Sequence, residues 1–359
     1  INTVFQLLAL LEKRPGLLEG TSRLLLMPDL FNYYLCGAQV SEYSIASTTQ
    51  MLDARTKMWS KEVLESLGIP ERILGGIVPC GTRLGFIKNG ICQELGIEPM
   101  EVIAVAGHDT QSALAAVPAR DKDFILISCG TWSLFGTELD EPVINGVSER
   151  LNITNEGGCQ GKISFLKNII GLWLIQESRR QWIREGKEYS FGHLEQMAAD
   201  AKPFKALIDP DAPEFVPAGN IPERIRSYCR KSGQKVPENE AELVRCIDES
   251  LALKYRMTLE EIKMCTGREY PAIHMVGGGT QSGLLCQMTA NACHCPVIAG
   301  PVEATVLGNA AMQLLATGEL RDLDQVRSVV GASAKVSIYE PKDTDQWEQV
   351  YGQYKKMLE

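Results

Sequence analysis

Asp109 lies where an enzyme would place a general base. It follows Gly107 and His108, directly after the apolar and partly β-branched run 102–106. That run predicts a buried strand, and open α/β sheets hold their catalytic groups at the ends of strands. A carboxylate there can take the proton of a reacting hydroxyl, which contributes about 10²- to 10⁴-fold to a rate. The local pattern supports equally well a cap for a helix that begins near Thr110.

A Gly-Thr dipeptide has the composition of a phosphate-binding turn. Gly130 and Thr131 separate two apolar runs, 124–128 and 132–136. This spacing predicts a hairpin whose backbone N–H groups and threonine hydroxyl can donate to an anion. Most such dipeptides in hairpins are only turns, so by itself the motif leaves both interpretations open.

Three consecutive glycines, Gly277, Gly278 and Gly279, stand between a predicted strand at 273–276 and a predicted helix at about 281–291. With a strand at 297–299 they form a βαβ element, in which glycines let a ligand approach the backbone at the start of the helix. A purely structural turn is the alternative. The sequence contains neither a complete G-x-G-x-x-G dinucleotide pattern here nor a G-x-x-x-x-G-K-[S/T] phosphate loop.

The elements around these motifs indicate an α/β protein with two domains. A polar segment at 118–123 suggests the boundary, so we expect domains at 1–119 and 120–359. The stretch 202–237, rich in Pro, Lys and Arg, is expected to be irregular. Helices are expected at 60–67, 169–183, 240–246, 251–265 and 303–316. Small residues in the helix expected at 303–316 would let another backbone or a flat ligand come close.

Composition narrows the class of protein. A chain of 359 residues, 45% hydrophobic and 23% charged, can build two domains with a sizeable core. The net charge of −9 argues against a broad nucleic-acid surface, and no apolar stretch approaches the roughly 18 residues of a membrane span. We therefore expect a small-molecule substrate, with neither nucleic acid nor membrane as partner.

The cysteines suggest a reducing compartment. Eleven are scattered among apolar segments and no secretion signal opens the chain, so we expect the cytoplasm. Cys229 and Cys246 flank a polar segment and could pair, although free thiols are the better interpretation. No zinc site is expected at Cys293, His294 and Cys295, because no second pair stands at zinc-like spacing.

Taken in order, the motifs resemble the FGGY carbohydrate kinases of the actin-like ATPase superfamily. The resemblance implies a ribonuclease H-like fold with two domains flanking a catalytic cleft. It covers residues 1 to about 320, and the segment Asn-Ile-Thr-Asn-Glu-Gly-Gly points to the branch of the family that acts on rhamnulose. The segments that carry it are 107–113, 128–134, 152–158, 166–176, 276–281 and 303–309.

The resemblance implies a role for each candidate residue. Asp109 would deprotonate O1 of L-rhamnulose as it attacks the γ-phosphate of ATP, and His108 would help to bind the sugar. Thr131 would contact the phosphates, and Asn168 and Gln176 the nucleotide. A glycine among Gly277, Gly278 and Gly279 would lie against the adenosine. Mg²⁺ would bridge the phosphates, since no dense group of carboxylates resembles an all-protein metal site.

One departure from the family pattern concerns the start of the chain. Family members begin with a glycine-rich acidic hairpin of the Asp-x-Gly-[Thr/Ser] kind, and nothing of that kind precedes residue 1. We therefore expect the first domain to be incomplete and the chain by itself to be an incomplete enzyme.

Three rival functions remain. Another ketose, fuculose or xylulose, could be the substrate, because part of the sugar contacts would lie in the absent hairpin region. The chain could act without catalysis as a nucleotide- or sugar-sensing actin-like module, although that role would not need Asp109. A nicotinamide-dependent oxidoreductase is the weakest alternative, because no acidic residue follows the glycines at about twenty positions.

Overall fold

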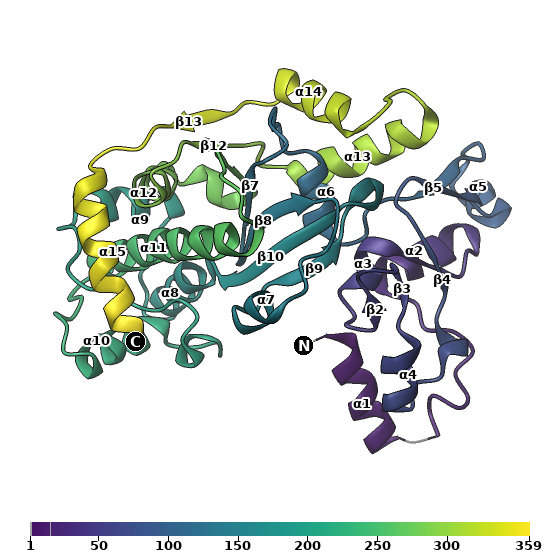
Figure 1. The fold of residues 1–359 in the computed structure, drawn as a ribbon, viewed down its shortest axis with the longest axis horizontal. Helices are drawn as coiled ribbons and strands as arrows, with labels where there is room; N and C mark the ends of the chain where they lie inside the picture. The colour runs from purple at the N-terminus through teal and green to yellow at the C-terminus, as the bar shows by residue number, and fades with distance from the viewer. Residues whose placement is uncertain (1, 15) are drawn as a thin grey trace.

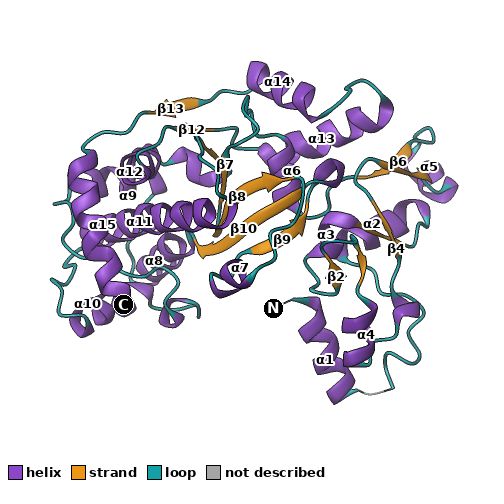
Figure 2. Cartoon of the chain, in the orientation of Figure 1, coloured by secondary structure: helices purple, strands orange, loops and turns teal. Residues whose placement is uncertain are grey.

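A seven-stranded mixed sheet forms the centre of the larger part of the molecule (Figures 1 and 2). The computed structural model describes residues 2–14 and 16–359. Strands β12, β11 and β7 run parallel, and the other neighbours are antiparallel. The order across the sheet is β13 (Ser337–Tyr339), β12 (Val297–Ala299), β11 (Ile273–Val276), β7 (Ile125–Cys129), β8 (Trp132–Leu139), β10 (Ile163–Ile170) and β9 (Thr154–Gly157).

Helices cover both faces of this sheet. Along β7, Ile125 and Ile127 enter one core and Leu126 the other, as the two-residue period of a strand requires. The first core lies against α8 (Trp173–Arg184), α9 (Phe191–Asp200), α10 (Ile221–Lys231), α11 (Glu240–Thr266) and α12 (Gly283–Cys293). The second lies against α6 (Asp109–Ala115), α13 (Ala304–Thr317) and α14 (Leu323–Ser333). The larger part also contains helices α7 (Gly146–Arg150) and α15 (Thr344–Leu358).

Helix α11 is a single helix of 27 residues, so the prediction of two separate segments was wrong. The gap left between the two predicted segments contains Asp248, Glu249 and Ser250, and all three are buried between packed elements. No proline or glycine interrupts the run. The Asn239 side chain accepts from Glu242 N at the start, and Gly267 ends the helix in the left-handed conformation.

Three further expectations need correction. The stretch 202–237 contains helix α10, which begins after an Asn220 cap, as well as a short 3₁₀ turn. The helix expected from 169 begins only at Trp173, because Ile169 and Ile170 complete β10. The strand before Asp109 exists as β6 (Glu101–Ala104), but it is half-buried in a two-stranded sheet rather than part of an open sheet. The hairpin and the βαβ element are confirmed, with α12 starting slightly later than predicted.

The first hundred or so residues form a smaller part, drawn in purple to blue at the right of Figure 1. Short two-stranded sheets and helices surround a core that includes Leu7, Met51, Leu64 and Ile73. The helix predicted at 60–67 is confirmed as α4, capped by Ser60. The elements are α1 (Thr3–Lys13), α2 (Met27–Cys36), β1 (Val40–Glu42), α3 (Tyr43–Ser47), β2 (Leu52–Asp53), β3 (Met58–Trp59), α4 (Lys61–Leu67), β4 (Gly76–Val78), β5 (Thr82–Phe86), α5 (Asn89–Leu95) and β6.

The smaller part contacts the edge strand β9 of the large sheet. Helix α3 lies beside β9, where Ser47 Oγ accepts from Gly157 N at 2.8 Å. Within the larger part, helices α6 and α13 pack so closely that a Cβ on Gly308 would lie 1.7 Å from Ser112 O, which confirms that the small residues of α13 admit another backbone. The polar segment 118–123 joins α6 to β7, and the domain boundary placed there stays a prediction. Among the described helices, none is long and apolar enough to cross a membrane.

Candidate active site

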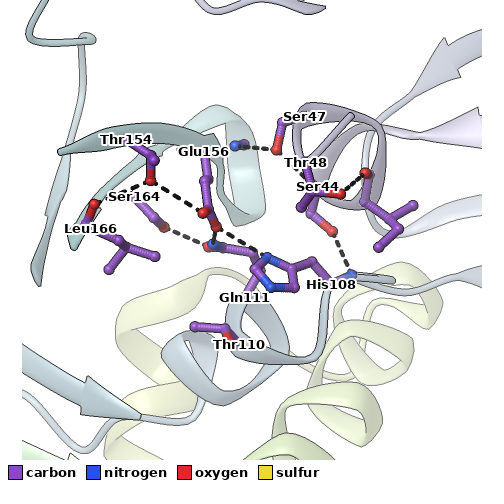
Figure 3. Close-up of polar contacts among 12 residues, drawn as sticks. Ser44, Ser47, Thr48, His108, Thr110, Gln111, Thr154, Glu156, Ser164 and Leu166 are labelled. Carbon is purple, nitrogen blue, oxygen red and sulfur yellow. Dashed lines mark hydrogen bonds and ion pairs between the residues drawn. The ribbon is translucent and has the colours of Figure 1, made fainter. Parts of the chain in front are cut away.

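The loop that carries His108 and Asp109 is held from the smaller part. Glu42, buried at the start of α3, accepts from Gly107 N at 2.9 Å. Ser44 Oγ accepts from His108 N at 3.1 Å (Figure 3). Burial raises the pKa of Glu42, against the lowering effect of its hydrogen bonds to Ser44, Gly107 and Ile45. The backbone that precedes Asp109 is therefore fixed by side chains distant in the sequence.

His108 is ion-paired with Glu156 of β9. His108 Nδ1 lies 3.1 Å from Glu156 Oε2, and Figure 3 shows the imidazole turned toward that carboxylate. Glu156 also accepts from Gln111 Nε2 at 3.3 Å and from Thr154 Oγ1 at 3.2 Å. Burial alone would lower the pKa of His108, but the hydrogen bond and the charge of Glu156, with the charges of Asp109 and Glu42, outweigh it and raise that pKa. The site thus favours a positively charged imidazole.

Asp109 is the first residue of α6, and His108 occupies the cap position. Its side chain is 79% exposed and its Oδ1 lies 3.9 Å from His108 Nε2. Among the hydrogen bonds between described residues, its carboxylate accepts only from Thr110 Oγ1, at 3.4 Å. The alternative of a capping aspartate finds no support in this geometry, because the carboxylate faces open space rather than the amides of the first turn.

Two adjoining cavities meet at this loop. One, of about 610 Å³, brings His108, Asp109, Thr131 and Asn168 to a common wall. The other, of about 1060 Å³, is also lined by His108 and Asn168, together with Glu156 and residues of the smaller part. A ligand in the first cavity can therefore touch Asp109 and the Gly-Thr hairpin at once.

Thr131 lies at the tip of the β7–β8 hairpin, as predicted. Its hydroxyl donates to Gln176 Oε1 at 3.1 Å, which links the hairpin to α8. The turn is fixed further because Leu172 N donates to Gly130 O at 2.9 Å and Trp173 N to Thr131 O at 3.1 Å. The hairpin tip thus stands between the cavity of Asp109 and the region of Gln176.

A third cavity, of about 370 Å³, brings Gln176 together with Gly278 and Gly279. This volume is within the roughly 300–1,000 Å³ of small-molecule pockets. The glycines differ in role: Gly277 has a φ of +85°, and a Cβ on Gly279 would lie 2.2 Å from Cys129 Sγ, whereas Gly278 faces open space. Of the residues predicted to touch nucleotide, Gln176, Gly278 and Gly279 therefore share one pocket, Gly277 does not line it, and Asn168 lies in the cleft cavities.

Several residues of the site were not singled out from the sequence. Glu156 lies within a segment that carried the resemblance, but its pairing with His108 joins residues 48 positions apart in the chain. Glu42 and Gln111 were missed for the same reason. Each is an ordinary polar residue in the sequence, and its role depends on a contact with a distant residue, Gly107 for Glu42 and Glu156 for Gln111. Asp248, which lines the third cavity, lies in the gap left between two predicted helical segments.

Comparison with known proteins identifies the family. The model of the C-terminal domain of the FGGY family of carbohydrate kinases matches residues 125–317, and that of the N-terminal domain matches residues 1–116. The chain belongs to the FGGY family of carbohydrate kinases. The predicted actin-like kinase fold with two domains is thereby confirmed.

Similar proteins of this family are rhamnulokinases. That of Bacteroides thetaiotaomicron is 42% identical over 357 residues, which cover 99% of this chain and 73% of the relative. That of Enterococcus faecalis is 40% identical over 346 residues, covering 96% of this chain and 69% of the relative.

Solved structures of other kinases have the same fold. A ligand-bound xylulose kinase from Lactobacillus acidophilus superposes with a TM-score of 0.78 at 18% identity, over 99% of this chain and 71% of that chain. Plasmodium falciparum glycerol kinase with ADP gives a TM-score of 0.76 at 15% identity, over the same shares of the two chains. At such identities the likeness concerns the fold alone.

Proposed function

We propose that this chain transfers the γ-phosphoryl group of ATP to O1 of L-rhamnulose, with Asp109 as the general base. The observation that carries the proposal is the cavity in which an exposed Asp109 carboxylate and the Thr131 hairpin face the same space. The choice of sugar rests on the rhamnulokinases to which the chain is similar at 36–42% identity.

The geometry fits the requirements of phosphoryl transfer, which are positioning, charge stabilisation and acceptance of the hydroxyl proton. Asp109 has no competing ion pair with Lys or Arg among the described residues, so its carboxylate is free to take the proton of a sugar hydroxyl. His108, held by Glu156, presents Nε2 on the same side and can donate to a sugar oxygen. The two neighbouring side chains therefore divide proton acceptance and sugar orientation.

The nucleotide would extend from this cavity to the pocket of Gln176. Thr131 would donate to the phosphates, and Gln176, Gly278 and Gly279 would contact the adenosine. Asn168 lines both cleft cavities, which supports a contact with the phosphates rather than with the base. Mg²⁺ bound to the phosphates would neutralise the charge that develops during transfer. We place the reaction in the cytoplasm, where the eleven free thiols would stay reduced.

The test is a coupled assay of ADP formation with L-rhamnulose, for the protein and for Asp109→Asn. Asparagine keeps the shape but cannot accept the proton, so we expect kcat to fall about 10²- to 10⁴-fold. Equal rates for both proteins would end the assignment of the base. Fuculose and xylulose in the same assay test the sugar. A protein that binds nucleotide but phosphorylates none of the three would support a non-catalytic module.

A further inference from the structure

Asp248 is a buried acid in the wall of the third cavity. It lies on α11, only 2% exposed, and lines the pocket that also holds Gln176 and Gly278. Its Oδ1 is buried without a hydrogen-bond partner in the described part of the chain. Buried polar atoms are nearly always paired, so one left open beside a cavity points to a ligand group that pairs with it.

Other orphaned side-chain atoms do not share this position. Five other described residues, Asp29, Ser178, His274, Arg327 and Tyr354, also have a buried atom without a partner, but none of them lines a cavity described above. His108 lines the cleft, yet its Nδ1 is ion-paired with Glu156. Asp248 is thus the case in which an unpaired buried atom and a pocket coincide.

Among the described residues, no Lys, Arg or His forms an ion pair with Asp248. Arg245, one turn earlier on α11, is ion-paired with Glu249 at 2.7 Å and donates to the backbone oxygens of Ala198 and Ala199. Burial, followed by the negative charges of Glu195 and Glu249, raises the pKa of Asp248 to about 8, against a smaller lowering effect of Arg245. At pH 7 most molecules therefore carry a neutral carboxylic acid here.

The other titratable groups around Asp248 do not change this conclusion. Cys129 of β7, Tyr255 of α11 and Cys286 of α12 lie close enough to interact with its charge, and all three are buried and neutral at pH 7. Tyr255 is already hydrogen-bonded to Ser133, at 2.6 Å. The Oδ1 atom of Asp248 is therefore left without a protein partner, in a residue that lines the cavity.

We propose that Asp248 reads the purine base of the nucleotide as a neutral carboxylic acid and so selects adenine. This inference rests on the proposed nucleotide pocket. A neutral carboxyl group offers one donor and one acceptor side by side. The exocyclic amine of adenine is a donor with an accepting ring nitrogen on either side, which complements that pair. A carboxylate has only acceptors and would instead suit the two adjacent donors of guanine.

Equilibrium binding of ADP and GDP, measured by calorimetry, tests this without turnover. We expect a preference for ADP at pH 7. ADP affinity should fall about tenfold between pH 7 and pH 9, because the protonated fraction falls from about nine-tenths to about one-tenth around a pKa of 8. Asp248→Asn keeps one donor and one acceptor, so it should bind ADP well and lose this pH dependence. Asp248→Leu should weaken ADP binding about tenfold or more and remove the preference over GDP.

Glu249→Gln is the matched control. Glu249 is the next residue on α11, is also buried, and has its pKa raised by burial to about 7, but it does not line the pocket. Its substitution should keep ADP binding pH-dependent, with the transition moved to lower pH because the negative charge of Glu249 helps to raise the pKa of Asp248. Thermal melts of every variant separate loss of binding from loss of folding.

Three outcomes would overturn the inference: ADP binding by the wild type that does not change with pH, a pH dependence retained by Asp248→Asn, or ADP binding by Asp248→Leu equal to that of the wild type. Failure of the proposed function looks different. A protein that phosphorylates no sugar but shows Asp248-dependent ADP binding would refute the kinase proposal and keep this one. A protein that phosphorylates rhamnulose but binds ADP independently of Asp248 would keep the kinase proposal and refute this one.

Discussion

The ion pair between His108 and Glu156 makes a sharp prediction about catalysis. Glu156→Gln removes the negative charge and keeps the size of the side chain. The paired atoms are 3.1 Å apart, and the side chains are only 17% and 11% exposed. At an effective dielectric constant of about 20, unit charges at 3.1 Å attract by about 5 kcal/mol, and desolvation takes back part of this energy.

We expect a net loss of about 1.5–3 kcal/mol in binding and orienting the sugar, the usual value of a hydrogen bond to a charged group. This corresponds to about 10- to 150-fold in kcat/KM for the sugar, with little change in KM for ATP. The pH profile should change as well. Glu156 raises the pKa of His108, so the alkaline limb of kcat/KM should move to lower pH in the variant.

The ion pair between His108 and Glu156 should also make the stability of the fold depend on pH. A native pKa raised above the unfolded value of about 6.5 stabilises the fold fully below that pH, and the contribution is lost as pH rises through the native pKa. The variant should therefore lose more thermal stability at pH 6 than at pH 9. Thr154→Val, which removes a hydroxyl donor to Glu156 without changing a charge, is the control and should keep the wild-type pH profile. An unshifted alkaline limb together with an unchanged KM for sugar would refute the role given to Glu156.

Three further substitutions test the residues proposed to contact the nucleotide. Gly279→Ala should lower the unfolding free energy by about 1–3 kcal/mol, because its Cβ would lie 2.2 Å from Cys129 Sγ, whereas Gly278→Ala, which meets open space, should unfold like the wild type. Equal melting temperatures for the two variants would contradict the close packing at Gly279. Thr131→Val removes a hydroxyl at the hairpin tip and should raise KM for ATP about tenfold with KM for sugar nearly unchanged. The reverse pattern in the coupled assay would move Thr131 from the phosphates to the sugar.

Local patterns in the sequence determined the elements that hold the site. Alternating and continuous apolar runs predicted the hairpin around Thr131 and the βαβ element around the three glycines, because strand pairing across a tight turn depends on adjacent residues. The helix expected at 60–67 was also found, with Ser60 as its cap. Asp109 could be recognised as a candidate base from its place after an apolar run, and the order of the motifs pointed to the family.

Only the tertiary structure showed which polar residues are buried and which take part in the site. Asp248 and Glu249 lie in the gap left between two predicted helical segments, and only the packing of α9 and α12 against α11 shows them buried in one continuous helix. Glu156 became the partner of His108 because β9 lies beside α3 and the 107–109 loop. Burial and charge pairing are sums over contacts between distant segments, whereas caps, turns and periodicity act over a few residues. The sequence therefore sufficed to propose Asp109 as a candidate base, and the fold was needed to find the residues that hold His108 beside it.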